Sequence, residues 1–104
     1  MSKTTVIDKD TVFKGNLKTD GNLKISGKAE GEIEVKGSVF IENGVFSGKL
    51  KAKLLISDGT IEGEIVCEQF IEINGGKVKA KLKAPAVLIS EFAEYPSLDE
   101  IIKN

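Results

Sequence analysis

The chain has no histidine, no arginine and one cysteine among its 104 residues. Without histidine it has no imidazole general base, no histidine-containing triad and no imidazole ligand for a metal. The absence of arginine argues against bidentate recognition of phosphate or carboxylate. A lone cysteine, Cys67, cannot form an internal disulfide, which indicates a reducing compartment. We therefore expect a protein that is not an enzyme and that uses no cofactor and no metal.

An excess of one charge is also missing. The 15 basic residues, all lysine, nearly balance 16 acidic residues, for a net charge of -1. Nucleic-acid-binding domains usually carry a clear basic excess, so we expect no nucleic-acid partner. No apolar run approaches the roughly 18 residues that span a bilayer. Residues 1–5 lack the apolar core of a signal peptide. These features predict a single cytoplasmic domain.

The chain does contain an internal repeat. An apolar-x-Gly-x-apolar unit occurs four times, and a fifth copy has alanine in the glycine position. The central residues are spaced by 16, 17, 15 and 17 residues, at Gly15, Gly31, Gly48, Gly63 and Ala80. A second series of apolar-x-Ile triplets runs in phase with the first and ends at Ile7, Ile25, Ile41, Ile56, Ile73 and Ile89. Two series with one period indicate that repetition governs the fold.

Each repeat has the pattern of short strands joined by sharp turns. Apolar and polar residues alternate, as in a strand with one buried face, and pairs such as Asn43-Gly44 and Asp58-Gly59 mark the turns. A unit this short has no room for two strands and a crossover helix. Coils of three short strands stacked in parallel bury each side chain on its equivalent in the next coil. We predict an all-β, parallel β-helix, or β-solenoid, over residues 5–91.

The inward residues are expected to form ladders along the axis. The isoleucines that end the triplets form one predicted ladder. Its neighbour is predicted to comprise Thr5, Leu23, Val39, Leu54, Ile71 and Val87, and a third to comprise Leu17, Ile33, Leu50, Ile65 and Leu82. Cys67 falls in another inward column, so we expect a buried structural thiol rather than a nucleophile.

The outward residues alternate in charge from coil to coil. Lys18, Glu34 and Lys51 form one such column. Opposite charges on neighbouring strands attract, and a slipped register would place like charges together. The lysines of the stretch Lys77–Ala84, KVKAKLKA, are accordingly assigned to the solvated outer face of the fifth coil rather than to a ligand site.

The repeat stops after Ile89. Ser97 and Glu100 have the spacing of a capping box, and Leu98, Ile101 and Ile102 would form one apolar face of a short helix. We therefore divide the chain into a short tail at 1–4, the solenoid, and a C-terminal segment at 92–104. A helix over 97–104 is predicted either to cap the last coil or to dock on a partner.

The repeat resembles that of the bactofilins, bacterial cytoskeletal proteins that polymerise. The matching elements are the glycine units Gly15-Asn16-Leu17, Gly31-Glu32-Ile33, Gly48-Lys49-Leu50 and Gly63-Glu64-Ile65, each followed by an apolar-x-Ile triplet. The resemblance implies a right-handed, three-sided β-helix of about six coils, counted from the six triplets. It also implies nucleotide-independent filaments near the inner face of the cell membrane that influence cell shape and position cell-wall or membrane proteins.

An uncapped coil is an adhesive surface, so the working surfaces are expected at the two ends. The N-terminal interface is predicted to contain Ile7, Val12, Phe13 and Leu17. The C-terminal end or cap is predicted to contain Val87, Ile89, Phe92, Leu98, Ile101 and Ile102. The principal partner would be the protein itself, and direct membrane binding is not expected because residues 1–5 offer only Met1 as a bulky apolar group.

Three alternatives follow from the same pattern. If the C-terminal helix covers one end, the product is a dimer or small oligomer that serves as a protein-binding adaptor. A hexapeptide-repeat acyltransferase or carbonic anhydrase would need histidine, which is absent. An ice- or polysaccharide-binding solenoid would show in-register columns of threonine or aromatic residues, and this chain has neither.

Overall fold

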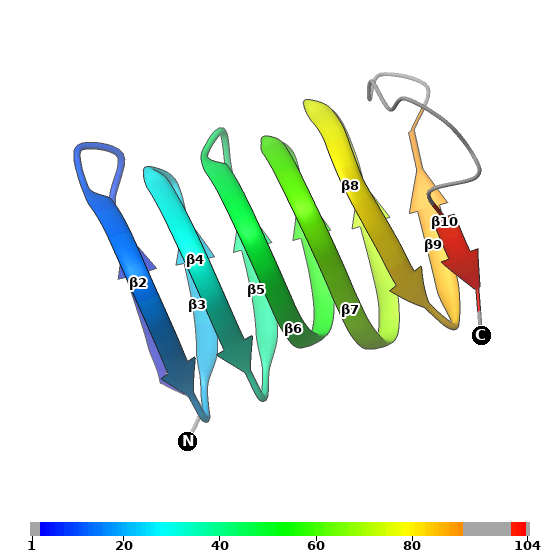
Figure 1. The fold of residues 1–104 in the computed structure, drawn as a ribbon, viewed down its shortest axis with the longest axis horizontal. Coiled ribbons are helices and arrows are strands. Elements are labelled where there is room, and N and C mark those ends of the chain that lie inside the picture. The colour runs from blue at the N-terminus through cyan, green and yellow to red at the C-terminus, as the bar shows by residue number, and fades with distance from the viewer. Residues whose placement is uncertain (1–2, 91–100, 104) are drawn as a thin grey trace.

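The computed structural model describes residues 3–90 and 101–103, and this part of the chain is entirely β-structure and turns (Figure 1). The strands are β1 (Thr4–Ile7), β2 (Val12–Thr19), β3 (Asn22–Ile25), β4 (Lys28–Val35), β5 (Ser38–Ile41), β6 (Val45–Ser57), β7 (Thr60–Ile73), β8 (Lys77–Ala84), β9 (Ala86–Ile89) and β10 (Ile101–Lys103). Strand alternates with turn at the period of the sequence repeat, so each repeat forms one layer.

The layers stack into a parallel β-solenoid of about five turns, with β9 and β10 in a sixth layer. One wall, the short-strand wall, contains β1, β3, β5, the C-terminal parts of β6 and β7, and β9. The other, the long-strand wall, contains β2, β4, the N-terminal parts of β6 and β7, β8 and β10. The first and last coils lie at opposite ends of the stack (Figure 1). The predicted all-β solenoid is confirmed.

The core runs along the axis between the two walls. Strand β8 shows the pattern best, because its four lysines are exposed while Val78, Ala80, Leu82 and Ala84 are buried. The predicted ladder of Ile33, Leu50, Ile65 and Leu82 is buried and in register. Since each side chain packs on its equivalent one layer away, no coil has a complete core by itself.

The fourth layer of the short-strand wall corrects the predicted ladders. Leu55, not Leu54, pairs with Val39 and Ile71, and the buried Ser57 takes the place predicted for Ile56. The cause is an irregularity in pairing after Ala52, where β7 holds one more residue than β6. A one-residue slip moves every following side chain to the other face of the sheet. Leu54 and Ile56 therefore point outward and are half-buried.

The predicted C-terminal helix is also corrected. Ile101 and Ile102 lie in β10, which pairs in parallel with β8, with Ile101 opposite Leu82. Residues 97–100 and 104 lie outside the described residues. A strand is favoured because the edge of β8 has unpaired backbone groups, and another strand can hydrogen-bond to them whereas a helix cannot. An eight-residue helix is also marginal by itself, and isoleucine is a strong strand former.

Glycines bend the long strands at a stacked corner. Gly15, Gly31, Gly48 and Gly63 have φ between +107° and +132°, a region disfavoured for residues with a side chain. A Cβ on Gly48 would lie 2.0 Å from the carbonyl oxygen of Gly31 in the layer below. The corner therefore requires glycine for both its conformation and its close approach.

Candidate assembly interfaces at the ends of the solenoid

The N-terminal end presents two strand edges. Strand β1 pairs with β3, and β2 pairs with β4, and neither strand has a second partner among the described residues. Half of the backbone donors and acceptors of these strands therefore point away from the stack. Unpaired edges of this kind are templates for pairing with another chain.

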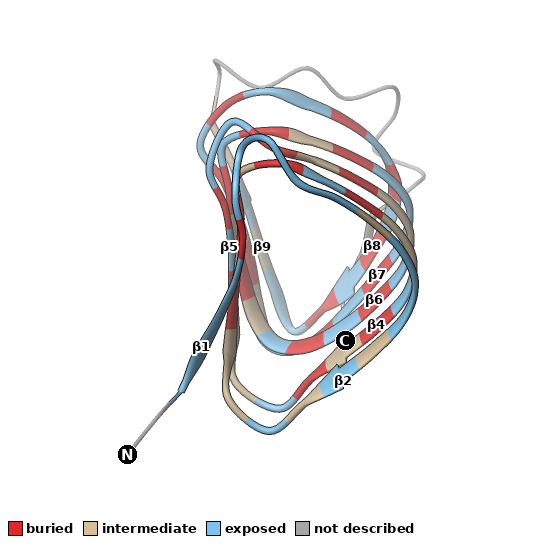
Figure 2. Cartoon of the chain, turned by 90° about the vertical axis from the view of Figure 1, so that its left-hand side faces the viewer, coloured by how far each residue is buried: buried red, intermediate tan, exposed pale blue. Residues whose placement is uncertain are grey.

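The side chains predicted for this end are brought together there. Ile7 is buried, while Phe13 and Leu17 are half-buried and pack against the core from one side only. Val12 lies beside them and is 61% exposed. In Figure 2 the first coil is coloured exposed or intermediate along β2, whereas β4 behind it carries buried residues. The end thus shows apolar side chains with one missing neighbour.

Gly15 extends this surface, and the sequence did not single it out as an interface residue. A Cβ on each of Gly31, Gly48 and Gly63 would meet the glycine carbonyl of the layer below. A Cβ on Gly15 would meet nothing within 4 Å, because β2 has no second partner strand among the described residues. A strand of a second copy could therefore approach the Gly15 backbone as closely as each interior glycine approaches the glycine of the next layer.

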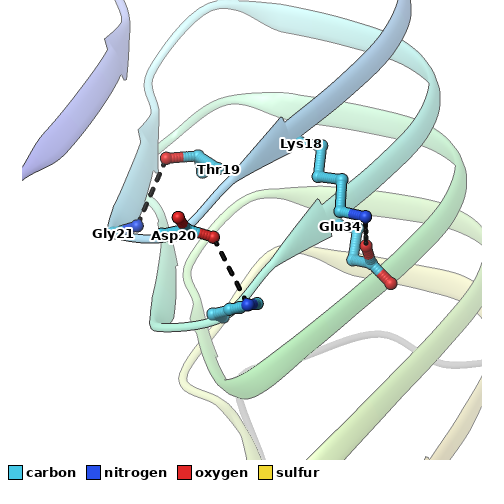
Figure 3. A network of polar contacts seen from close by, with 6 residues as sticks. Lys18, Thr19, Asp20, Gly21 and Glu34 are labelled. Atoms are coloured by element: carbon cyan, nitrogen blue, oxygen red, sulfur yellow. Dashed lines mark hydrogen bonds and ion pairs between the residues drawn. The ribbon is translucent and has the colours of Figure 1, made fainter.

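Polar contacts fasten the first coil to the second (Figure 3). Lys18 Nζ lies 3.3 Å from a Glu34 carboxylate oxygen, and Lys36 Nζ lies 3.6 Å from Asp20. The Gly21 N–H donates to Thr19 Oγ1 at 3.3 Å in the turn between β2 and β3. The hydrogen bond is local to the turn, whereas the two exposed ion pairs join the coils, and Lys18–Glu34 is the opposite-charge stacking expected from the alternating outward charges.

The C-terminal end is built differently. Val87 and Ile89 in β9 are half-buried and pack against the core, and β9 pairs only with β7 among the described residues. On the long-strand wall β10 covers part of β8. Phe92 and Leu98, the other residues predicted for this end, lie outside the described residues.

Cys67 is buried in the fourth layer of the long-strand wall, as predicted. Burial raises the pKa of its thiol from 9.0 to about 12, because the thiolate would be desolvated. The thiol therefore stays protonated at neutral pH and is a poor nucleophile. Within the described residues there is no group of three or more histidine, cysteine, aspartate or glutamate side chains placed to hold a metal ion.

The comparisons with known proteins agree with this architecture. The family model described as "Bactofilin: Polymer-forming cytoskeletal" matches residues 5–96. The chain belongs to the bactofilin family. Comparison with curated proteins and with solved structures returned no match. The resemblance seen in the glycine units is confirmed, and the bactofilin family is a structural, polymer-forming one.

The described part of this bactofilin, residues 3–90 and 101–103, includes no helix with the length and apolar character to cross a bilayer.

Proposed function

We propose that this bactofilin is a non-enzymatic cytoskeletal scaffold that assembles end to end through its terminal coils, without nucleotide. The observation that carries the proposal is the incomplete first coil, with its unpaired strand edges and its one-sided packing of Phe13 and Leu17. A second copy stacked there would pair the edges and complete the core by the same interactions that join the coils within one chain.

The filament would act in the cytoplasm at the inner face of the cell membrane, where it would position cell-wall or membrane proteins. A surface of repeated coils suits this role because each added subunit repeats the same outer face. The polymer-forming character of the family supports the proposal.

Electron microscopy of the purified chain, with and without added nucleotide, tests this function. We expect filaments in both samples, since stacking of coils needs no phosphate-binding site. Monodisperse monomers at every protein and salt concentration would overturn it. Filaments that form only with nucleotide would overturn the nucleotide-independent part.

A second candidate is a capped solenoid that forms only dimers or small oligomers and acts as an adaptor. The observation that favours it is β10, which pairs with β8 and so occupies part of the C-terminal edge. Deletion of residues 92–104 separates the two candidates. Longer assemblies after deletion would show that the segment acts as a cap, whereas an unchanged length distribution would reject capping.

A further inference from the structure

The outer surface of the short-strand wall is unusually apolar. Phe40 and Leu88 are 39% and 57% exposed, and Val6 is 55% exposed. Leu54, Ile56 and Phe70 point outward on the same wall and are half-buried. The long-strand wall, by contrast, is covered mainly by lysine and glutamate. The sequence prediction missed this surface because it placed Leu54 and Ile56 in the core.

One column of this wall has a self-complementary order. From the first layer to the sixth it reads Val6, Lys24, Phe40, Ile56, Glu72 and Leu88, each residue paired in register with the next. Read in reverse against itself, the column places Val6 opposite Leu88, Lys24 opposite Glu72, and Phe40 opposite Ile56. Every apolar residue then meets an apolar one, and every charge meets its opposite.

We propose that two copies of the chain associate side by side through the short-strand wall, with their solenoid axes antiparallel. A two-fold axis running along the strands, between the layers of β5 and β6, generates this arrangement. Such an axis maps the column onto itself in reversed order, as an isologous interface requires. The two central Phe40–Ile56 contacts would be flanked by two Lys24–Glu72 ion pairs.

The alternative side-by-side orientation is disfavoured by the same column. If the axes of the two copies were parallel, Lys24 would face Lys24 and Glu72 would face Glu72. Like charges placed opposite each other at an interface oppose association. The order of charges therefore selects the antiparallel orientation.

Two further columns flank this one. On the side of the turns, Glu42 and Asp58 would face each other across the two-fold axis, and Glu42 is neutralised by Lys24 of its own chain. The column on the other side carries no charge. It contains Thr4, Asn22, Ser38, Leu54, Phe70 and Ala86. Lys24 and Glu72 also keep partners within their own chain, since Lys24 Nζ lies 3.0 Å from Glu42 and the Asn74 side chain donates to Glu72 at 3.2 Å. Association would therefore give each charge a second partner without isolating it from the first.

Charge reversal tests the pairing directly. Within one chain Lys24 and Glu72 are separated by the layers of β5 and β6, a spacing of roughly 14 Å at about 4.8 Å per layer. Direct coupling between them can therefore arise only across two copies. The test compares Lys24→Glu, Glu72→Lys and the double variant with Lys53→Glu as a control, because Lys53 is exposed and lies outside both columns.

The readouts are the dissociation constant of side-by-side association, from sedimentation at several concentrations, and the width of assemblies in electron micrographs. Each single reversal is expected to raise the dissociation constant about tenfold, because two symmetry-related pairs become repulsive. The double variant is expected to return it to within about threefold of the native value. The proposal would be overturned if the dissociation constant of the double variant were as high as the two single increases multiplied together predict. It would also be overturned if Lys53→Glu raised the dissociation constant as much as the single reversals do.

Phe40→Ser gives a second arm that leaves the charges unchanged. We expect assemblies one solenoid wide and of unchanged length, because the ends of the stack are not altered. Failure of end-to-end assembly would instead leave short particles that are still two solenoids wide, so the two interfaces can be judged separately. Single-width native assemblies, or native protein that binds anionic phospholipid vesicles through Phe40 instead of pairing, would contradict this interface.

Discussion

The first coil and the middle coils use the same kinds of residue in the same positions, yet their environments differ. Phe46 is fully buried in the third layer, whereas Phe13, two layers below in the same inward column, is only half-buried. Leu50 and Leu17 differ in the same way. The first coil is thus a middle coil that lacks one neighbour, and it shows which interactions a second copy would complete.

The glycine corner allows the sharpest form of this comparison. Gly48→Ala would place a Cβ 2.0 Å from the Gly31 carbonyl oxygen at φ +128°. Strain and displacement of the layer together are expected to cost about 4 kcal/mol or more. Gly15→Ala meets no atom within 4 Å, so only its backbone strain remains, about 1–3 kcal/mol.

Denaturant unfolding of both alanine variants, under conditions that keep the protein monomeric, measures the difference. Under assembly conditions Gly15→Ala should also shorten the filaments, because its new methyl group points to where the next copy would sit. Equal destabilisation by the two substitutions would contradict the view that nothing in the monomer covers Gly15.

The phenylalanine pair gives the next largest difference. Phe46→Ala is expected to lower the free energy of unfolding by about 3–5 kcal/mol, as for a fully buried aromatic residue. Phe13→Ala should cost less than about half of that in the monomer, since the Phe13 side chain keeps contact with solvent. Thermal or chemical unfolding of monomeric protein checks both values, and a Phe13→Ala loss as large as that of Phe46→Ala would show that the first coil is already complete.

Cys67 and Thr19 lie in the same inward column, but Cys67 is buried in a middle coil and Thr19 is half-buried in the first coil. The burial of Cys67 makes the stability of the fold depend on pH. Its thiol pKa is raised from 9.0 to about 12 in the folded state. The unfolded chain therefore loses this proton first. The contribution of Cys67 to stability is complete below pH 9.0 and is lost as pH rises toward about 12, by about 1.4 kcal/mol per pH unit.

The difference in unfolding free energy between the native chain and Cys67→Ala, measured from pH 8 to 11, isolates this effect from the titrating lysines. The difference should shrink or reverse as pH increases. A thiol reagent at pH 8 should react with unfolded protein much faster than with folded protein. Equal reaction rates would mean that the fourth layer opens readily.

The smallest effect is expected from the surface charges that join the first and second coils. Lys18 and Glu34 lie 3.3 Å apart, with side chains 74% and 43% exposed. Lys18→Met should therefore cost no more than about 0.2–1 kcal/mol, and the loss should vanish at high salt. A double-mutant cycle with Glu34→Gln measures the coupling, and a coupling above this range would assign these charges a larger role than setting register.

The sequence predicted what repetition determines. The glycine positions, the inward column that ends at Leu82 and the burial of Cys67 followed from period and alternation. Leu54-Leu55-Ile56 was assigned to the wrong register because three successive apolar residues fit either face. Only the irregular pairing after Ala52 decides between them.

The ends of the solenoid were harder to predict than its middle coils. Local signals at 97–104 favoured a helix, whereas the pairing of Ile101–Lys103 with β8 depends on an edge that appears only once the coils are stacked. Phe13 and Leu17 lie in the first coil and are half-buried there, and their role in an assembly interface stays a prediction. The apolar outer wall was missed because the register error assigned Leu54 and Ile56 to the core.

The length distribution of Phe13→Arg assemblies tests the central claim most directly. Val66→Arg is the matched control, because Val66 is an exposed apolar residue in the middle of the stack. If the first coil is an assembly surface, Phe13→Arg will give monomers or short oligomers under conditions where the native chain and Val66→Arg form filaments, since a charge would enter an apolar contact. Filaments of native length from folded Phe13→Arg protein would contradict the account.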